Sequence, residues 1–476
     1  MQDGTTNVFR HYAPDVSTHY YQPDSPREPL LLYQGAICSP ASEAEDDAYQ
    51  GDVWLRWEPK PHVEARGMRP TTPERFGAFM GRSSRPPQGI WVDRRTIRLP
   101  GDRGVPPIPL TEAMLEADYS TQQFSEPIYP PEIGDGTELT KVSGLLINGF
   151  QGHDGMQLAA PSDRRWLHRG RTCARGAGWV VTLDDLSTTN PGLWDVLESS
   201  GGYAATHIVS LVRENSATFT AEQATDALEA VTCALNLAIG RRIDIAVPVG
   251  WQDDEPVWTK WTAGQAEAFG PTHTWLDPMI TSRQIGETIG RVLDCWSDSL
   301  RRETLFYASS YYLQALSQYA ETGTSNAVSG LLLLASSWLV EEKEVCTRTA
   351  WDKKKTAQGQ IRMLLDMPEC RINAAVPCGF NYLAEVAQKI YESRERKGAC
   401  PDGLDCIIRM RNDVVHPTHK RRGGWTYQEW IEAHNLVAHF LELSLLSYIG
   451  YTGQYHPRIA MERMTGYVEY MPWSGC

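Results

Sequence analysis

Short apolar runs separated by glycine and proline residues mark the first half of the chain. They are rich in valine, isoleucine, leucine and tryptophan, which favours β-strands bounded by turns. The predicted strands are Leu30–Tyr33, Val53–Trp57, Ile90–Leu99, Val142–Phe150, Trp179–Leu183, Ile208–Val212 and Ile243–Val249. The connection from Pro100 to Pro131 lacks periodicity and is interpreted as a surface excursion. This pattern predicts a β-rich region that extends to about residue 278.

One helix is expected to interrupt these strands. Thr220 is predicted to cap its N-terminus, because Gln223 follows three residues later and the two side chains suit a capping box. Apolar residues with helical spacing follow. Gly240 is expected to end the helix, since glycine readily takes the left-handed conformation found after helix C-termini.

A tryptophan-rich segment then runs from Val247 to Trp261. The acidic sequence in its centre, Asp253-Asp254-Glu255-Pro256, predicts a turn between two strands. Trp251, Trp258 and Trp261 are interpreted as aromatic side chains buried in a hairpin. A tryptophan platform for a sugar or a nucleobase is the alternative.

After Pro278 the apolar positions recur with the period of an α-helix. The predicted helices are Ser282–Ser297, Leu300–Tyr319, Asn326–Glu344, Gln358–Met367, Asn381–Lys397, Gly403–Val415 and Thr426–Tyr448. The fold class is therefore predicted to be α+β, with a β-rich N-terminal domain and an all-α helical bundle. We expect a flexible tail at 1–28, a β-rich sensor or substrate-presenting domain at 29–278, a helical domain at 279–456 and a C-terminal tail at 457–476.

The composition of the 476 residues is that of a globular protein, with 41% hydrophobic and 22% charged residues. No segment is expected to span a membrane, and a cytoplasmic location is expected. The formal net charge of −14 argues against broad binding to nucleic-acid backbones but leaves room for a local basic site. Ten cysteines without a CxxC motif favour reduced thiols, and no metal site or cofactor is predicted.

The candidate chemistry lies in the sequence Arg411-Asn412-Asp413-Val414-Val415-His416-Pro417. On a helix, Asn412 and His416 project about 40° apart and share one surface, whereas Arg411 projects about 140° from His416. Pro417 disfavours helical geometry at the preceding residue, so His416 should lie at the helix C-terminus, where the helix dipole favours a protonated imidazole. Arginine can clamp a phosphate, histidine can transfer a proton and asparagine can hold either in place, as metal-free RNA cleavage requires.

A basic, glycine-containing segment follows the motif. His419, Lys420, Arg421 and Arg422 precede Gly423-Gly424 and are predicted to contact RNA beside the site. A solvated connecting loop is the alternative interpretation of such a run.

Two histidines on the last predicted helix are weaker candidates. His434 and His439 lie five residues apart, a spacing that does not place both imidazoles on one face as a metal pair would require. We expect packing or surface roles for them.

The helical region resembles a HEPN domain. The resemblance rests on the Arg-Asn-x-x-x-His pattern late in the region, on the tyrosine-rich and leucine-rich helices before it, and on the long apolar helix after it. It covers residues 300–456, and the ending Leu445-Leu446-Ser447-Tyr448-Ile449-Gly450-Tyr451-Thr452-Gly453-Gln454-Tyr455 is similar to that of the ApeA-like HEPN group. For the N-terminal half the resemblance rests on domain order alone.

The resemblance implies a metal-independent endoribonuclease that cleaves tRNA or other cellular RNA in antiviral defence or abortive infection. It implies that Arg411, Asn412 and His416 are catalytic and that the domain forms a homodimer or a higher oligomer in which two motifs face each other. Glu341 or Glu342 is a further candidate for a supporting acidic contact, with an exposed helix-end carboxylate as the alternative. The N-terminal domain is expected to receive a phage-derived or cellular trigger. Two other functions stay open: a non-catalytic HEPN binding or dimerisation scaffold, and a HEPN toxin silenced by a partner enzyme.

Overall fold

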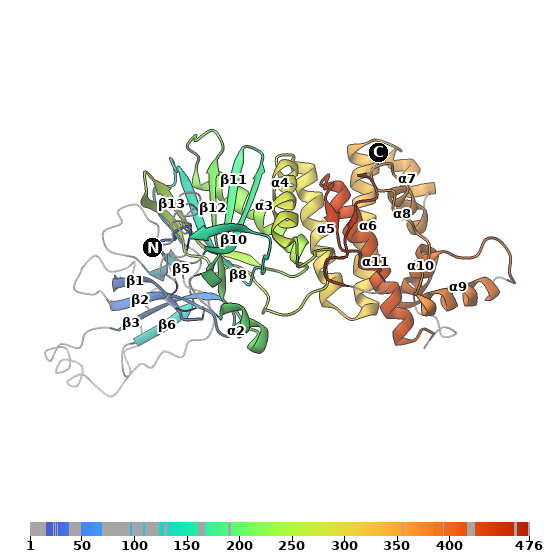
Figure 1. The fold of residues 1–476 in the computed structure, drawn as a ribbon, viewed down its shortest axis with the longest axis horizontal. Helices are drawn as coiled ribbons and strands as arrows, with labels where there is room; N and C mark the ends of the chain where they lie inside the picture. The colour runs from blue at the N-terminus through green and yellow to red at the C-terminus, as the bar shows by residue number, and fades with distance from the viewer. Residues whose placement is uncertain are drawn as a thin grey trace, which may run out of the picture.

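The computed structural model describes residues 16–21, 23, 25, 27–37, 49–68, 96–97, 108–109, 123–127, 131–159, 167–188, 192–354, 356–393, 395–416, 424–460 and 464–474. Antiparallel sheets occupy the first half of this described part, and helices dominate the second half (Figure 1). The predicted α+β class is confirmed.

Two antiparallel sheets form the β-rich half. The larger has the strand order β7-β14-β13-β8-β12-β11-β10-β9, and the smaller has the order β1-β2-β3-β6. The strands of the larger sheet are β7 (Glu132–Gly134), β8 (Lys141–Ile147), β9 (Met156–Ala159), β10 (Leu167–Gly176), β11 (Trp179–Asp185), β12 (Ala205–Arg213), β13 (Asp244–Gln252) and β14 (Glu255–Lys260). Those of the smaller sheet are β1 (Leu30–Ile37), β2 (Tyr49–Arg56), β3 (His62–Met68) and β6 (Gln123–Pro127). Short pairs join β4 (Thr96–Ile97) to β5 (Ile108–Pro109) and β15 (Gln454–Tyr455) to β16 (Glu469–Tyr470).

The larger sheet is buried on both faces. Side chains alternate along a strand, so on β8 Leu145 and Ile147 belong to the core shared with the smaller sheet, whereas Leu146 belongs to the core shared with the helices. Burial on both faces explains why the central strands are continuous apolar runs rather than alternating ones.

Two local predictions in this half are confirmed. Helix α3 (Ala221–Ile239) begins at a capping box of Thr220 and Gln223 and ends at Gly240, whose φ is 75°. Strands β13 and β14 form the predicted hairpin, with Asp253 and Asp254 in its turn. The indole rings of Trp251, Trp258 and Trp261 are buried, so the hairpin interpretation holds and the platform alternative is wrong.

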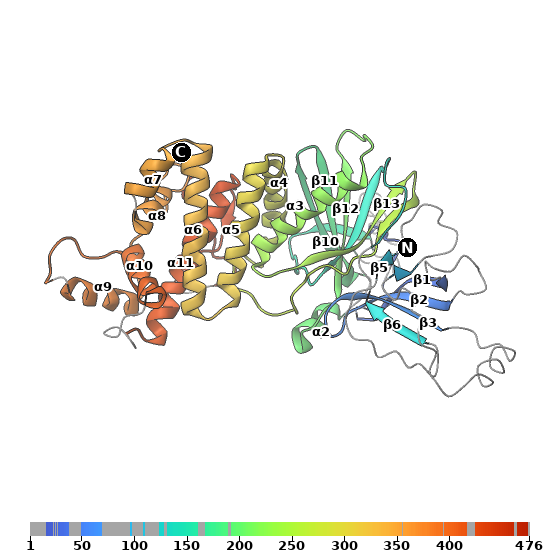
Figure 2. The ribbon, with the colours of Figure 1, turned by 180° about the vertical axis from the view of Figure 1, so that it is seen from behind.

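Helix α4 (Thr281–Trp296) packs directly on β10. Gly286 and Gly290 of α4 face the backbone carbonyl groups of Cys173 and Arg175, and a methyl group at either glycine would collide with them. The absence of side chains at these positions lets the helix lie close to the strand. Together α3 and α4 lie between the large sheet and the rest of the helices (Figure 2).

The remaining helices form a bundle around α6 and α11. Their bounds are α5 (Ser299–Ser317), α6 (Ala320–Ser336), the π-helical turn η4 (Ser337–Glu342), α7 (Arg348–Lys354), α8 (Ala357–Leu365), α9 (Asn381–Ser393), α10 (Gly403–Val415) and α11 (Tyr427–Tyr448). The predicted bounds of α10 are confirmed. The helix predicted over Asn326–Glu344 begins earlier, at Ala320, and its last turn is π-helical. The sequence did not predict helix α7, helix α2 (Leu193–Ser200), the 3-10 turn η3 (Leu186–Thr188) or strands β3, β6, β7, β9 and β10. Of the strand predicted at 90–99, only Thr96–Ile97 lies within the described residues.

One continuous helix, Ala320–Glu342, is long and apolar enough to cross a membrane, although no such segment was expected from the sequence. Its most apolar window is 61% buried in the protein, and the helix packs against α5, α8 and α11. Core helices of soluble proteins also meet this criterion, so it is weak evidence for a membrane span.

A single hydrophobic core runs from the large sheet through α3 and α4 into the bundle. The segment after β15 joins it, because Met471 packs against this core and Arg458 is buried beside α11. The domain limits proposed from the sequence stay predictions.

Candidate functional site

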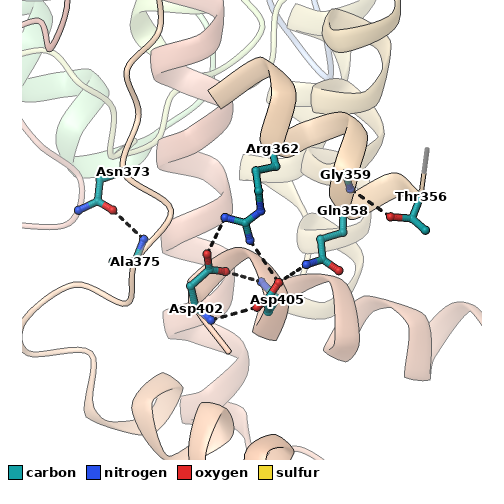
Figure 3. Close-up of polar contacts among 8 residues, drawn as sticks. All are labelled: Thr356, Gln358, Gly359, Arg362, Asn373, Ala375, Asp402 and Asp405. Carbon is teal, nitrogen blue, oxygen red and sulfur yellow. Dashed lines mark hydrogen bonds and ion pairs between the residues drawn. The ribbon is translucent and has the colours of Figure 1, made fainter. Parts of the chain in front are cut away.

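The helix that carries the candidate motif, α10, is fixed at its N-terminus by acidic side chains. Asp405 N–H donates to the Asp402 carboxylate at 2.9 Å, and Asp402 N–H donates to Asp405 at 3.2 Å. Arg362 of α8 pairs with Asp402 at 2.7 Å and with Asp405 at 3.2 Å, and Gln358 also contacts Asp405 (Figure 3). The hydrogen bond with Asp402 raises the pKa of Arg362. Sequence reasoning missed this arginine because it lies on another helix.

The apolar face of α10 points into the bundle. Leu404, Cys406, Ile407 and Met410 are fully buried, whereas the last residues, from Val414 to His416, are exposed. The helix is therefore anchored along its length and presents its C-terminal end at the surface. In both ribbon views α9 and α10 lie at the end of the molecule opposite the four-stranded and eight-stranded sheets (Figures 1 and 2).

Arg411 is half-buried, and its positive charge is not paired with an acidic side chain among the described residues. Its Nη1 donates to Oδ1 of the neighbouring Asn412 at 3.2 Å, and its Nε is buried without a hydrogen-bond partner. Among the described residues, no carboxylate forms an ion pair with Arg411. The guanidinium therefore retains hydrogen-bonding capacity for an anion.

His416 is the C-terminal cap of α10. Its backbone has left the helical conformation, with φ −124° and ψ 65°, as predicted from the proline that follows. Its N–H still donates to the carbonyl oxygen of Asn412 at 2.9 Å, and its side chain is exposed. Asn412 thus contacts both other members of the motif, Arg411 through its side chain and His416 through its backbone. Pro417 itself lies outside the described residues.

Asp413 ties the last turn of α10 to the start of α11. Its carboxylate lies 3.4 Å from Nε of Arg409 and accepts from Nε1 of Trp425 at 3.3 Å. The two arginines of this turn therefore differ, since Arg409 is held by a carboxylate of its own helix.

The structure does not connect the two candidate supporting carboxylates to the motif. Glu341 pairs with Arg348 of α7 at 2.5 Å, and Glu342 lies 3.7 Å from Nε of Arg301. Within the described ranges, no hydrogen bond or ion pair joins either glutamate to the motif on α10. Both carboxylates instead fasten helices of the bundle.

The predicted RNA-contact residues are His419, Lys420, Arg421 and Arg422, and all four lie outside the described residues. In the part of the chain that the structure describes, no three histidine, cysteine, aspartate or glutamate side chains are grouped so as to hold a metal. His439 is buried and stacks on Tyr455, and burial lowers the pKa of both His434 and His439 to about 4. His439 therefore has a packing role, one of the two roles expected for these histidines.

Comparisons with known proteins match both halves of this architecture. Residues 134–270 match the family model of the YopA central domain, and residues 298–469 match that of the YopA C-terminal domain. The chain is 24% identical over 359 residues to the SPbeta prophage-derived uncharacterized protein YopA of Bacillus subtilis (strain 168). The aligned region covers 72% of this chain and 78% of that protein. The chain is a distant homologue of YopA.

The two YopA matches cover different parts of the fold. The central-domain match contains strands β8 to β14 of the larger sheet and α3, and the C-terminal match contains α5 to α11 with the whole motif. No solved structure matches the chain. The HEPN resemblance therefore remains a prediction that rests on the motif and its helices.

Proposed function

We propose that the chain is a metal-independent endoribonuclease whose catalytic residues are Arg411, Asn412 and His416. The observation that supports this best is the pairing of an arginine without a described carboxylate partner and an exposed histidine at the end of one anchored helix. A half-buried arginine without a described carboxylate partner can bind a phosphate, and an exposed imidazole can transfer a proton.

In the proposed reaction, the ribose 2′-hydroxyl attacks the adjacent phosphorus as its proton passes to a neutral His416. The bond to the 5′-oxygen breaks, and that oxygen takes a proton from a protonated histidine. Arg411 neutralises the charge that grows on the non-bridging oxygens, and Asn412 positions the arginine. The products are a 2′,3′-cyclic phosphate and a 5′-hydroxyl, and no metal ion takes part.

The proposed catalytic unit is a homodimer, because the motif of one chain contains one histidine, His416, whereas the reaction uses a base and an acid. The surface around His416 is suited to a second copy. Val414 and Val415 at the end of α10 and Tyr427 at the start of α11 are 45%, 41% and 67% exposed, and exposed apolar side chains can form an interface. Substituting aspartate for Val415 should weaken self-association in sedimentation experiments if this face forms the dimer.

The biological setting that we propose is the contest between phages and bacteria. The relative from Bacillus subtilis is prophage-derived. A ribonuclease carried by a phage genome would cleave tRNA or other cellular RNA when a trigger reaches its β-rich half. Because the four-stranded and eight-stranded sheets lie far from α10, such a trigger would act through the helices between them.

The direct test compares RNA cleavage by the wild-type protein with that by the His416→Ala and Arg411→Ala variants in EDTA. Loss of the histidine should slow cleavage by roughly 10²–10⁴-fold and loss of the arginine by roughly 10²–10³-fold. The matched control is Arg409→Ala, which removes an arginine of the same helix that is already paired with Asp413. Equal rates for all four proteins would contradict the proposal. Absence of cleavage together with loss of self-association in the His416 and Arg411 variants would favour the scaffold function.

A further inference from the structure

A cavity of about 480 Å³ lies where the β-rich half meets the helical bundle. Its walls come from the C-terminal end of α3, the connection at 267–273, the end of α5, one turn of α11 and Arg458. We call it the junction cavity. Its volume falls in the range of roughly 300–1,000 Å³ that is typical of sites for small molecules.

Arg241, the residue after the glycine that ends α3, lines this cavity and is 7% exposed. Its guanidinium lies 4.5 Å over the ring of Phe269, and Nη2 donates to the carbonyl oxygen of Gly149 at 2.9 Å. The other two nitrogens, Nε and Nη1, are buried without a hydrogen-bond partner. Burial lowers the pKa of Arg241 to about 10, because it disfavours the charged form.

This arrangement is costly in the absence of a ligand. A buried guanidinium is normally paired with a carboxylate. The charge of Glu267 on the same wall favours the charged form of Arg241 and so raises its pKa, but among the described residues no carboxylate forms an ion pair with it. Arg458, on the same wall, differs because it is paired with Glu442. Arg241 is therefore a buried charge at a cavity wall with donors that an anion can use after a small movement of the side chain.

Two polar side chains of α11, His434 and Asn435, also line the cavity. Nδ1 of His434 is buried beside Gly323 of α6 and has no hydrogen-bond partner. Glu267 is the acidic group on the wall, and its carboxylate accepts the backbone N–H of Arg242 at 3.4 Å. A ligand with one anionic group and a donor-bearing remainder would match this distribution, whereas a polyanion would not.

We infer that the junction cavity binds a small molecule through one oxyanion group, a phosphate or a carboxylate, with Arg241 as the anchor and His434 as a second polar contact. The occupant would contact residues of α3, α5 and α11 at once and so join the two halves of the molecule. This inference is independent of the proposed ribonuclease, since binding and RNA cleavage are measured separately.

The test is calorimetric titration of the full chain at constant ionic strength. The probes are inorganic phosphate, adenosine 5′-monophosphate and the monocarboxylate lactate, with chloride as the reference anion. Saturable binding of phosphate and the nucleotide would identify a phosphate ligand, and binding of lactate alone would identify a carboxylate ligand. Each result supports the site. No saturable heat from any probe up to about 10 mM, or the same response to chloride, would overturn it.

Two variants assign any binding to this cavity. Arg241→Gln should weaken it by roughly tenfold to a hundredfold, the loss expected for a charge-assisted contact. Arg241 also contacts Gly149 and Phe269, so Arg241→Gln could disturb the fold as well as the site. The second variant, Ser317→Trp, leaves Arg241 in place and fills the cavity from the end of α5. The matched control, Gln314→Trp, adds the same ring to an exposed position of the same helix. Unchanged binding in Ser317→Trp would place the ligand elsewhere and overturn the inference.

Discussion

Replacing Glu442 by glutamine should destabilise the protein strongly, because this carboxylate is the charge partner of a buried arginine. Glu442 is 1% exposed and Arg458 is 8% exposed. Arg458 donates from Nε to Oε2 at 3.0 Å and from Nη2 to Oε1 at 2.5 Å, and the hydroxyl of Tyr312 donates to Oε1 at 2.5 Å. Burial on its own would lower the pKa of Arg458, but the charge of Glu442 outweighs burial and raises it.

The expected loss follows from leaving Arg458 charged and buried without its counter-ion. Breaking a buried pair by removing one partner costs about 3–5 kcal/mol, whereas removing both charges together can be nearly neutral. Glutamine retains the volume of the side chain and can still accept from Tyr312, so we expect a value near the lower end, about 3 kcal/mol. That is a large fraction of the roughly 5–15 kcal/mol by which most domains are stable.

Urea unfolding followed by tryptophan fluorescence measures this difference. Glu442→Gln should lower the free energy of unfolding by about 3 kcal/mol, and Glu442→Gln combined with Arg458→Met should recover most of it. The reasoning also predicts that the segment after β15 detaches first in the single variant, visible as faster hydrogen exchange at residues 456–460. The reasoning would be refuted if Glu442→Gln lowered the free energy of unfolding by less than about 1 kcal/mol, or if adding Arg458→Met made the protein less stable than Glu442→Gln alone.

Three further predictions concern other parts of the fold. Asp405→Ala removes half of the capping box of α10 and a partner of Arg362, so it should cost about 1–2 kcal/mol and speed hydrogen exchange along α10. Thr220→Ala should cost about 1 kcal/mol in urea unfolding, whereas Thr220→Ser should cost little because serine keeps the cap. His434 and His439 have pKa values lowered to about 4, so the unfolded chain binds more protons and stability should fall as the pH decreases from about 6.5 to 4, by at most about 3 kcal/mol for each histidine. Unfolding curves at pH 7 and pH 5 test this, and a His439→Leu variant with an undiminished pH dependence would argue against His439 as a source.

The elements predicted best from the sequence are those with local signals. Helix α3 has its own cap and stop residues, and α10 is bounded by Asp402 and by the histidine before Pro417. These boundaries depend on residues a few positions apart, so the sequence alone determines them.

Strand β10 could not be predicted in this way. Its sequence, LHRGRTCARG, is polar and contains no apolar run. It is a strand because β9 and β11 pair with it on either side and α4 covers it through Gly286 and Gly290. Both causes are tertiary contacts, which periodicity does not reveal.

Some features of the candidate site could likewise be predicted from local sequence, and others could not. The position of His416 at a helix end followed from Pro417 and the pattern before it. The pairing of Arg409 with Asp413, the contact of Arg362 with the capping box and the burial of Arg241 at the junction cavity all depend on side-chain placement. Segments far apart in the sequence form that cavity, so no single stretch indicates it.

End-group analysis of RNA cut by the wild-type protein in EDTA tests the central claim most directly. The proposed chemistry predicts fragments with 2′,3′-cyclic phosphate and 5′-hydroxyl ends, at a rate reduced by roughly 10²–10⁴-fold in His416→Ala. Cleavage that needs Mg²⁺ and leaves 5′-phosphate ends, or a His416→Ala variant as active as the wild type, would contradict it.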